Sequence, residues 1–161
     1  MEVKTLMMSD GVIRSLVPSR AFTDIQVESE FTLENVQFST IQSRAFSMRV
    51  QKAVRMRGCS VKQLRTEAFV LAVRDKVVIE RNVFDEVDMR ALAKITPDRA
   101  PPTQPHHGVT FIFENNTIGD FQDGALEIDD GFREVRMERV VLKRTCNCAE
   151  LDRWRRRIVT R

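Results

Sequence analysis

Apolar residues in this chain recur at a fixed step of 23 residues. A period that holds in three separate columns is the signature of a repeat protein, in which each repeat stacks on the next. A single repeat cannot bury its own apolar face, so its neighbours must do so. The sequence therefore predicts a solenoid of stacked coils. The three columns are Ala45, Ala68 and Ala91; Phe38, Val61 and Phe84; and Ile41, Leu64 and Val87.

The repeat extends in both directions, with one interruption. Ala125 follows Ala91 by 34 residues, and the excess of 11 falls in the Pro-rich segment 96–107. Because proline lacks the N–H group that a sheet ladder needs, we expect this segment to leave the sheet as a loop and to return in register. The pattern continues upstream and downstream at a step of 24 residues. We predict about six coils within residues 12–145.

Apolar residues also alternate within each coil, as in Phe69, Leu71 and Val73 and again in Val77 and Ile79. A period of two predicts a strand with one buried face, and no helical period is present. We therefore expect an all-β fold. Each coil should contain two strands joined by a bend and followed by a short third segment.

Residues 109–128, VTFIFENNTIGDFQDGALEI, resemble the coils of right-handed parallel β-helix proteins of the pectate-lyase-like kind. The resemblance extends over about residues 16–142. It implies a single right-handed parallel β-helix. That fold carries both polysaccharide enzymes and non-catalytic surface proteins, so the resemblance leaves two classes of function open.

A rival resemblance is to leucine-rich repeat proteins. Residues 77–92 fit the pattern LxLxxNxLxxLxxxAF, and residues 146–154 resemble the start of the cysteine-containing C-terminal cap of extracellular members. Such repeats place apolar residues three and six positions after the AF pair, where this chain has Arg49 and Lys52 in one coil. The alternation that follows the AF pair suits a second strand better, and we therefore favour the β-helix.

Two of the three cysteines lie near the end of the chain. Cys146 and Cys148 are not expected to pair with each other, and as cap residues they would need partners further downstream. We therefore interpret residues 146–161 as a cap-like segment and basic tail of a truncated chain. A two-cysteine metal site would lack further ligands, so we predict no metal or cofactor. Cys59 aligns with the bend residues Asn82 and Asn116, which favours a core position.

Few residues suggest chemistry. His106 and His107 end the Pro-rich insertion and form a candidate binding pair, although no cysteine or carboxylate lies near them in sequence to complete a metal or acid/base site. The acidic candidates for polysaccharide chemistry all fall in bends or turns, where turn formation accounts for them. Asn115 begins an N-x-T glycosylation acceptor and aligns with an outward position. The acidic candidates are Asp120, Asp123, Asp129 and Asp130.

One outward column offers a candidate binding surface. Arg55 and Arg136 share it with Thr32, Val78 and Ile112, which makes a mixed basic and apolar stripe. The net charge of +3 is too small for this length to predict nucleic-acid binding. The apolar content of 42% and charged content of 30% are those of a folded, soluble domain.

These observations favour a non-enzymatic recognition or scaffold ectodomain over a carbohydrate-active β-helix enzyme. We expect a protein or glycan partner, and an extracellular or cell-surface parent protein that is either secreted or membrane-anchored. The oligomeric state cannot be read from the repeat.

Overall fold

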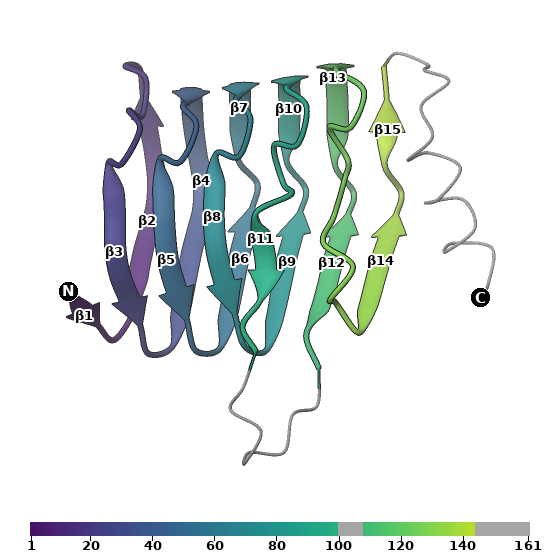
Figure 1. Cartoon of the computed structure of the whole chain (residues 1–161). Coiled ribbons are helices and arrows are strands. Elements are labelled where there is room, and N and C mark those ends of the chain that lie inside the picture. Colours follow the sequence, from purple (N-terminus) through teal and green to yellow (C-terminus); the bar gives the residue numbers. More distant parts are fainter. Residues whose placement is uncertain (100–107, 144–161) are drawn as a thin grey trace.

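The computed structural model describes residues 1–99 and 108–143, and within them every regular element is a strand (Figure 1). The strands follow each other in coils of similar length, as the repeat predicts. Their bounds are β1 Glu2–Val3, β2 Leu6–Ile13, β3 Phe22–Val27, β4 Glu30–Ile41, β5 Phe46–Val50, β6 Ala53–Arg57, β7 Ser60–Leu64, β8 Phe69–Val73, β9 Lys76–Glu80, β10 Val83–Val87, β11 Ile95–Pro97, β12 Thr110–Glu114, β13 Thr117–Phe121, β14 Glu134–Glu138 and β15 Val141–Leu142.

The strands form three faces around one core. Face A is the five-stranded sheet β1-β3-β5-β8-β11. The ten-stranded sheet is bent, because the first part of β4 pairs with β6 and its second part pairs with β7. Face B therefore contains β6, β9, β12 and β14 with the first parts of β2 and β4. Face C contains β7, β10, β13 and β15 with the second parts of β2 and β4.

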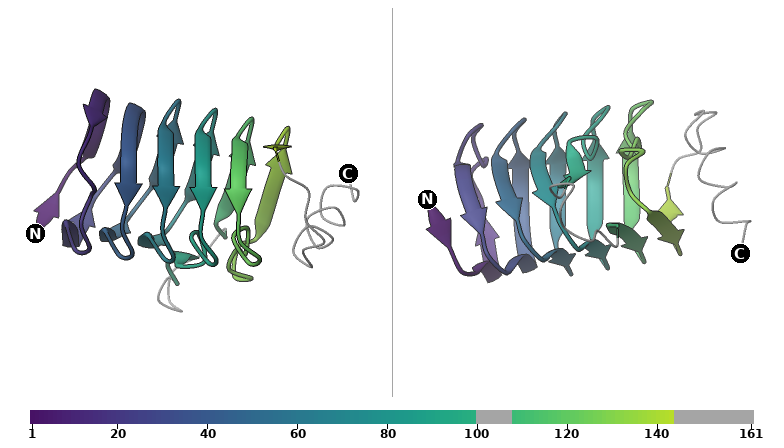
Figure 2. Two further views of the ribbon diagram at one scale, coloured as in Figure 1. Left: turned by 90° about the horizontal axis from the view of Figure 1, so that it is seen from above. Right: turned by 60° about the horizontal axis from the view of Figure 1, so that its bottom comes forward.

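All strand pairs are parallel, and each joins one coil to the next. In Figure 1 the chain descends through the nearer strands of face A and rises through the farther strands of faces B and C while it advances from left to right, which is a right-handed path. Figure 2 shows corresponding strands of successive coils aligned along the solenoid. The structure is therefore a right-handed parallel β-solenoid of about six turns, which agrees with the solenoid that the repeat predicts and with the fold that the β-helix resemblance implies.

The core consists of columns of like side chains. Phe22, Phe46 and Phe69 stack on one another, with ring centroids 5.0 Å and 5.3 Å apart. Phe46 is fully buried, as are the alanines at one equivalent position in four successive coils. Each coil thus closes the apolar face of the coil before it. The buried alanine column is Ala45, Ala68, Ala91 and Ala125.

The corner between faces B and C repeats one backbone conformation in every coil. One residue in each coil has a positive φ there, between 49° and 61°, which turns the chain from one face to the next. Such φ angles are costly for residues other than glycine, asparagine and aspartate, yet arginine occupies two of the positions. The corner residues are Asp10, Asn35, Gly58, Arg81, Asn115 and Arg139.

Buried asparagines join the coils behind this corner. Asn116 Oδ1 accepts a hydrogen bond from the backbone N–H of Asn82 at 3.0 Å and another from Asn82 Nδ2 at 3.1 Å, and Asn116 Nδ2 donates to Ile79 O at 2.9 Å. Asn82 Oδ1 in turn accepts from the N–H of Cys59 at 2.9 Å. The two side chains are at most 1% exposed, so their amides satisfy backbone groups that water cannot reach.

Cys59 continues this ladder with sulfur in place of an amide. Its Sγ lies 3.5 Å from Leu33 O, the carbonyl that corresponds to the Met56 O bonded by Asn82 Nδ2. Cys59 is 2% exposed, and this burial raises the pKa of its thiol. The predicted core position of Cys59 is therefore confirmed.

The details differ from the sequence prediction in three respects. The short third segment of each coil is a regular strand on face C, as β10 shows. Paired strands begin at Glu2, before the expected start of the repeat at residue 12. Thr96 and Pro97 belong to β11, so the segment 96–107 begins within the sheet, and residues 100–107 are outside the described part of the chain. The absence of helices from the described residues excludes the leucine-rich repeat alternative that has a helix in each repeat.

The asparagine ladder can be tested at Asn116. We predict that Asn116→Ala lowers the free energy of unfolding by about 3 kcal/mol, because it leaves the Asn82 amide and Ile79 O buried without a partner. The neighbouring Asn115→Gly is the control, since glycine adopts the positive φ of this exposed position without strain. Urea denaturation followed by circular dichroism measures both. Equal, small losses in the two variants would contradict the proposed role of the ladder.

The Cys59 thiol should make stability depend on pH under alkaline conditions. Because burial raises the folded-state pKa, the unfolded chain loses its thiol proton first, from a pH of about 8.5. Stability contributed by the protonated thiol is therefore full below that pH and is lost above it, at a limiting slope of about 1.4 kcal/mol per pH unit. We expect the difference in unfolding free energy between the parent and Cys59→Ala to shrink between pH 8 and pH 10. A constant difference would show that the thiol does not titrate in this way.

Candidate functional site

The outward column predicted on face B exists. The register aligns its members across β4, β6, β9, β12 and β14, and Val78 at its centre is only 6% exposed. The column therefore has a covered apolar centre with a cation on either side. Its members are Thr32, Arg55, Val78, Ile112 and Arg136.

Both arginines of that column have carboxylate partners. Arg55 Nε lies 3.4 Å from Glu30 Oε1, and Arg136 Nε lies 2.6 Å from Glu134 Oε1. The hydrogen bond from Arg136 to Glu134 also raises the pKa of that guanidinium. These ion pairs offset the positive charge that an acidic ligand would need on face B. The prediction that Arg55 and Arg136 form a binding surface remains a prediction.

The aspartates considered for catalysis are divided between two regions, and Asp130 directly follows Asp129 in the second. Asp120 on β13 lies beside Glu86 on β10, both exposed on face C, and Asp123 follows in the next turn. Asp129 lies at a hollow on face A, where its Oδ1 accepts a hydrogen bond from the N–H of Gly131 at 2.8 Å. Within the described residues, no three histidine, cysteine, aspartate or glutamate side chains are grouped so that they could hold a metal ion.

Several predicted residues cannot be placed. His106, His107, Cys146 and Cys148 all lie outside the described residues, so their predicted roles are untested. Asn115 is described: it is exposed at the corner between faces B and C, beside the buried Asn116. Its side chain can therefore be reached from solvent, as the glycosylation acceptor requires.

Face A carries a concave surface built from described residues. Three adjoining hollows of about 1070, 500 and 370 Å³ form one groove across β3, β5, β8 and β11. The second hollow shares Arg49, Ala72 and Thr96 with the largest. It shares Asp24 and Ser47 with the smallest, together with the side chain of Val70. We call this continuous surface the face A groove.

Short side chains form the floor of the face A groove. On β8 the two outward residues are Val70 and Ala72, and their partners on β5 and β11 include Ser47 and Thr96. The inward residues of the same strands are buried in the core, so the floor is rigid. The hollow forms because the side chains on these adjacent strands are short, whereas those at both sides are longer.

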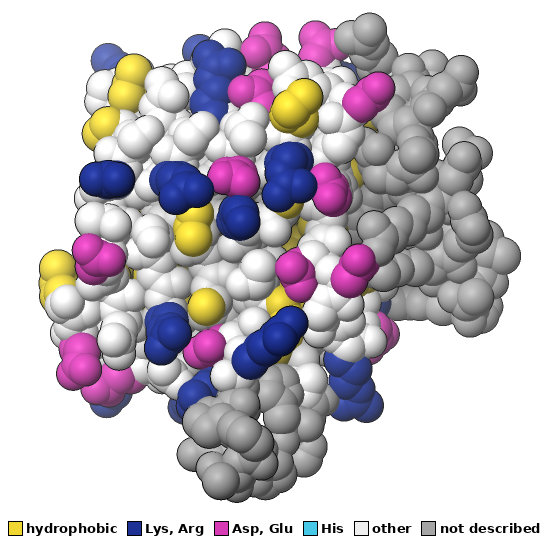
Figure 3. Space-filling view, viewed as in Figure 1, with side chains coloured by type: hydrophobic (Ala, Val, Ile, Leu, Met, Phe, Trp, Pro, Cys, Tyr) yellow, Lys and Arg dark blue, Asp and Glu magenta, His cyan; other side chains and the backbone are white. Residues whose placement is uncertain are grey.

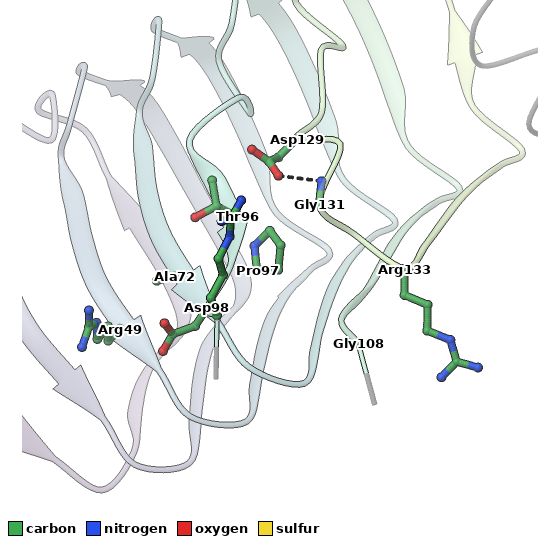
Figure 4. Close-up of a pocket in the computed structure, with 10 residues that line it drawn as sticks. Arg49, Ala72, Thr96, Pro97, Asp98, Gly108, Asp129, Gly131 and Arg133 are labelled. Carbon is green, nitrogen blue, oxygen red and sulfur yellow. Dashed lines mark hydrogen bonds between the residues drawn. The ribbon is translucent and has the colours of Figure 1, made fainter. Parts of the chain in front are cut away.

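The largest hollow lies where sheet A ends. β11 is the last strand of that sheet, Pro97 has no N–H to donate, and the Ile95 N–H bonds back to Leu92 O at 3.2 Å. Proline at such a position prevents pairing with a further strand. The next coil therefore passes face A without a strand and approaches β11 at Gly131, where a Cβ would lie 2.9 Å from Pro97 Cγ. Figure 4 shows this cleft between β11 and the segment from Asp129 to Arg133.

Cations outnumber anions around the face A groove. Its lining includes six basic residues and three aspartates. Asp98 already pairs with Arg74 at 3.9 Å, and Arg44 pairs with Glu67 at 3.5 Å. Figure 3, which looks onto this face, shows lysine and arginine side chains across it with acidic ones between them. The basic residues are Arg20, Arg44, Arg49, Lys94, Arg99 and Arg133.

Three of these cations are available to a ligand. Among residues 1–99 and 108–143, no carboxylate forms an ion pair with Arg20, Arg49 or Lys94, and all three side chains are exposed. Sequence reasoning did not single them out, because basic residues on exposed strands are common. The available signal was the register, which sets Arg49 in one row with the short residues Ala72 and Thr96.

Comparison with protein-family models, with curated proteins and with solved structures finds no match to this chain. The described part also contains no helix of the length and apolar character that a membrane span requires. The fold places the chain in the class of parallel β-solenoids. Its function must therefore be argued from its own surface.

The exposed Asn115 gives a direct test of the glycosylation acceptor. When the chain is expressed behind a secretory leader in a eukaryotic host, we expect one N-linked glycan, detected as a mass increase that an endoglycosidase removes. Thr117→Ala should abolish the increase, and Thr117→Ser should retain it, because serine also completes the acceptor. An unmodified chain that is nevertheless secreted would contradict the prediction.

Proposed function

We propose that this protein is a non-enzymatic recognition solenoid, from an extracellular or cell-surface parent, that binds a linear acidic glycan in the face A groove. The observation that carries the proposal is the groove itself: its floor has short side chains on β5, β8 and β11, and its lining includes Arg20, Arg49 and Lys94, which have no carboxylate partner among the described residues.

The shape of the groove favours a long ligand. The middle hollow alone is lined by residues of β3, β5, β8 and β11, and strands of adjacent coils are about 4.8 Å apart, so the groove spans on the order of 14 Å along the solenoid axis. Solenoids commonly use such extended faces for binding. A compact metabolite would use only one hollow, whereas a chain-like ligand would contact all of them.

The chemistry of the groove favours an acidic ligand. Neutral sugars are commonly bound by stacking on exposed aromatic rings, but this chain has no tyrosine and its single tryptophan lies outside the described residues. The phenylalanines point into the core, and Phe22 alone is half-buried. Recognition must therefore rely on cations such as Arg49 and Lys94, and on hydrogen-bonding groups such as Ser47 and Thr96.

A glycan fits this surface better than an acidic peptide. Extended peptides usually add a strand to an open sheet edge or insert side chains into apolar pockets. The floor strands β5 and β8 are paired on both sides, and Pro97 blocks the edge at β11. The floor is shallow, with only Val70 and Ala72 as apolar members on β8. Hydroxyl and cationic groups suit a sugar chain that carries carboxylate or sulfate groups.

The carboxylates in the groove support binding rather than catalysis. Asp98 forms an ion pair with Arg74, and Asp129 accepts the Gly131 N–H. Both interactions hold the chain at the point where sheet A ends. These structural roles account for the two acidic groups nearest the largest hollow.

Heparin serves as the test polymer. We expect Arg49→Ala combined with Lys94→Ala to elute from a heparin column at lower salt than the parent. The slope of log affinity against log salt should fall by about one for each cation removed, as counterion release predicts for a linear polyanion. The matched control is Arg55→Ala combined with Arg136→Ala on face B, which should elute with the parent because those cations are already paired.

Two outcomes would count against this proposal. Equal retention of the face A variant and the parent would exclude the groove. A loss confined to the face B variant would transfer the site to the column of Arg55. Polyglutamate of similar charge should compete less well than heparin, and stronger competition by polyglutamate would indicate an acidic protein partner.

A further inference from the structure

The middle hollow of the face A groove has its own pattern of charge. It spans four coils, because its lining comes from β3, β5, β8 and β11 and from the residue just before β11. The charged residues of this lining are Asp24 on β3, Arg49 on β5 and Lys94 directly before β11. β8 contributes only apolar residues. Along the solenoid axis the charge is therefore negative, positive, neutral and positive.

The register fixes the positions of the two cations relative to the uncharged coil. Arg49 on β5 pairs with Ala72 on β8. Lys94 lies level with Val70, because the residues that follow them pair with each other. Arg49 and Lys94 thus flank β8 from opposite sides, two coils apart. Since adjacent strands are about 4.8 Å apart, the two cations are separated by roughly 10 Å along the axis.

The coil of β3 does not extend this cationic pattern into the middle hollow. The exposed carboxylate of Asp24 would repel an anion placed there, and the β3 residue in the row of Arg49 is the uncharged Gln26. Arg20, which precedes β3, lines the smallest hollow and not the middle one. Within the middle hollow, an anion is therefore favoured at β5 and at β11, with a coil between them that has no cation.

We propose that the glycan bound in the face A groove has an acidic group on every second sugar, and that the neutral sugar between two acidic ones lies over Val70 and Ala72. A pyranose ring in an extended glycan is about as long as the spacing between two coils, so charges two sugars apart match cations two coils apart. This inference rests on the proposed function and names the class of glycan that the groove selects.

The surface of β8 suits a neutral sugar better than a charged one. A carboxylate above Val70 and Ala72 would lose part of its water without gaining a cation of its own. A neutral sugar brings C–H groups to these side chains, and an N-acetyl group would bring a methyl group, whose burial is favourable. Ser47 pairs with Val70 across the ladder, where its hydroxyl can bond to a sugar hydroxyl.

Charge density alone would produce the opposite preference. A polymer with a carboxylate on every sugar holds more condensed counterions over the same length than one with a carboxylate on every second sugar. A surface that attracts polyanions without regard to spacing therefore binds the denser polymer more tightly. The proposed match between sugars and coils reverses this order, so the two polymers separate recognition by spacing from general attraction.

Hyaluronan and polygalacturonate are the probes, because hyaluronan has a carboxylate on every second sugar and polygalacturonate has one on every sugar. Isothermal titration calorimetry of the full chain compares oligosaccharides of equal length at one salt concentration. We expect hyaluronan to bind about threefold more tightly or better, since polygalacturonate sets an unpaired carboxylate above β8. Equal affinities, or tighter binding of polygalacturonate, would overturn the inference.

Substitution of Val70 tests the role of the uncharged coil. Val70→Arg supplies a cation there, so it should raise the affinity for polygalacturonate about threefold, as one exposed ion pair allows, and lower that for hyaluronan. Val70→Met adds bulk without charge and should only weaken hyaluronan binding. The matched control is Val83→Arg on face C, where valine is 40% exposed, and it should leave the ratio of the two affinities unchanged. A change of that ratio by Val83→Arg equal to the change by Val70→Arg would contradict the assignment.

Failure of this inference can be distinguished from failure of the proposed function. Suppose that Arg49→Ala combined with Lys94→Ala lowers heparin retention, while the parent binds polygalacturonate at least as tightly as hyaluronan. The groove then binds acidic glycans, and only the alternation is wrong. If the double variant is retained like the parent, the groove is not the site, and both proposals fail. Circular dichroism of each variant confirms that the solenoid is intact.

Discussion

The parallel hydrogen-bond ladder between coils is the interaction on which the whole structure depends. Because every strand pairs in register with the equivalent strand of the next coil, like residues lie directly above one another. The stacked rings of Phe22, Phe46 and Phe69 and the buried alanine column result from this equivalence. A slip of one residue in any strand would turn its buried face outward. The corners and the Asn82–Asn116 ladder hold the strands of successive coils in this register and prevent such a slip.

Much of the fold could be predicted from spacing, because burial in a solenoid imposes the same chemistry at the same position of each coil. The apolar columns, the interruption after Ala91 and the bend at Asn82 and Asn116 all follow from that rule. The backbone at the corners did not follow from it. Arg81 and Arg139 adopt positive φ angles that arginine rarely takes. Their conformation is imposed by the hydrogen-bonded strands that precede and follow each corner. No local sequence signal predicts it.

The candidate site was less predictable than the fold. The outward column of Arg55 and Arg136 was aligned correctly, but its charges are balanced by Glu30 on the neighbouring strand and by Glu134 two residues away. The face A groove depends on low residues such as Val70 and Ala72, which are unremarkable in sequence and form a floor only when three coils are set side by side. A hollow that forms because side chains are small has no recognisable sequence motif, whereas a column of buried phenylalanines produces a repeating one.

The return of the chain to register after segment 96–107 has a consequence for how such a molecule can change. Glu114 pairs with Glu80 as regularly as Glu80 pairs with Arg57, although 34 residues separate the first pair and 23 the second. Extra chain between coils therefore leaves the stacking intact, because loop closure costs little more as a loop lengthens. The size of the solenoid and the character of its loops can vary independently: whole coils extend the groove in fixed increments, and an excursion at one edge adds new surface without disturbing the rest.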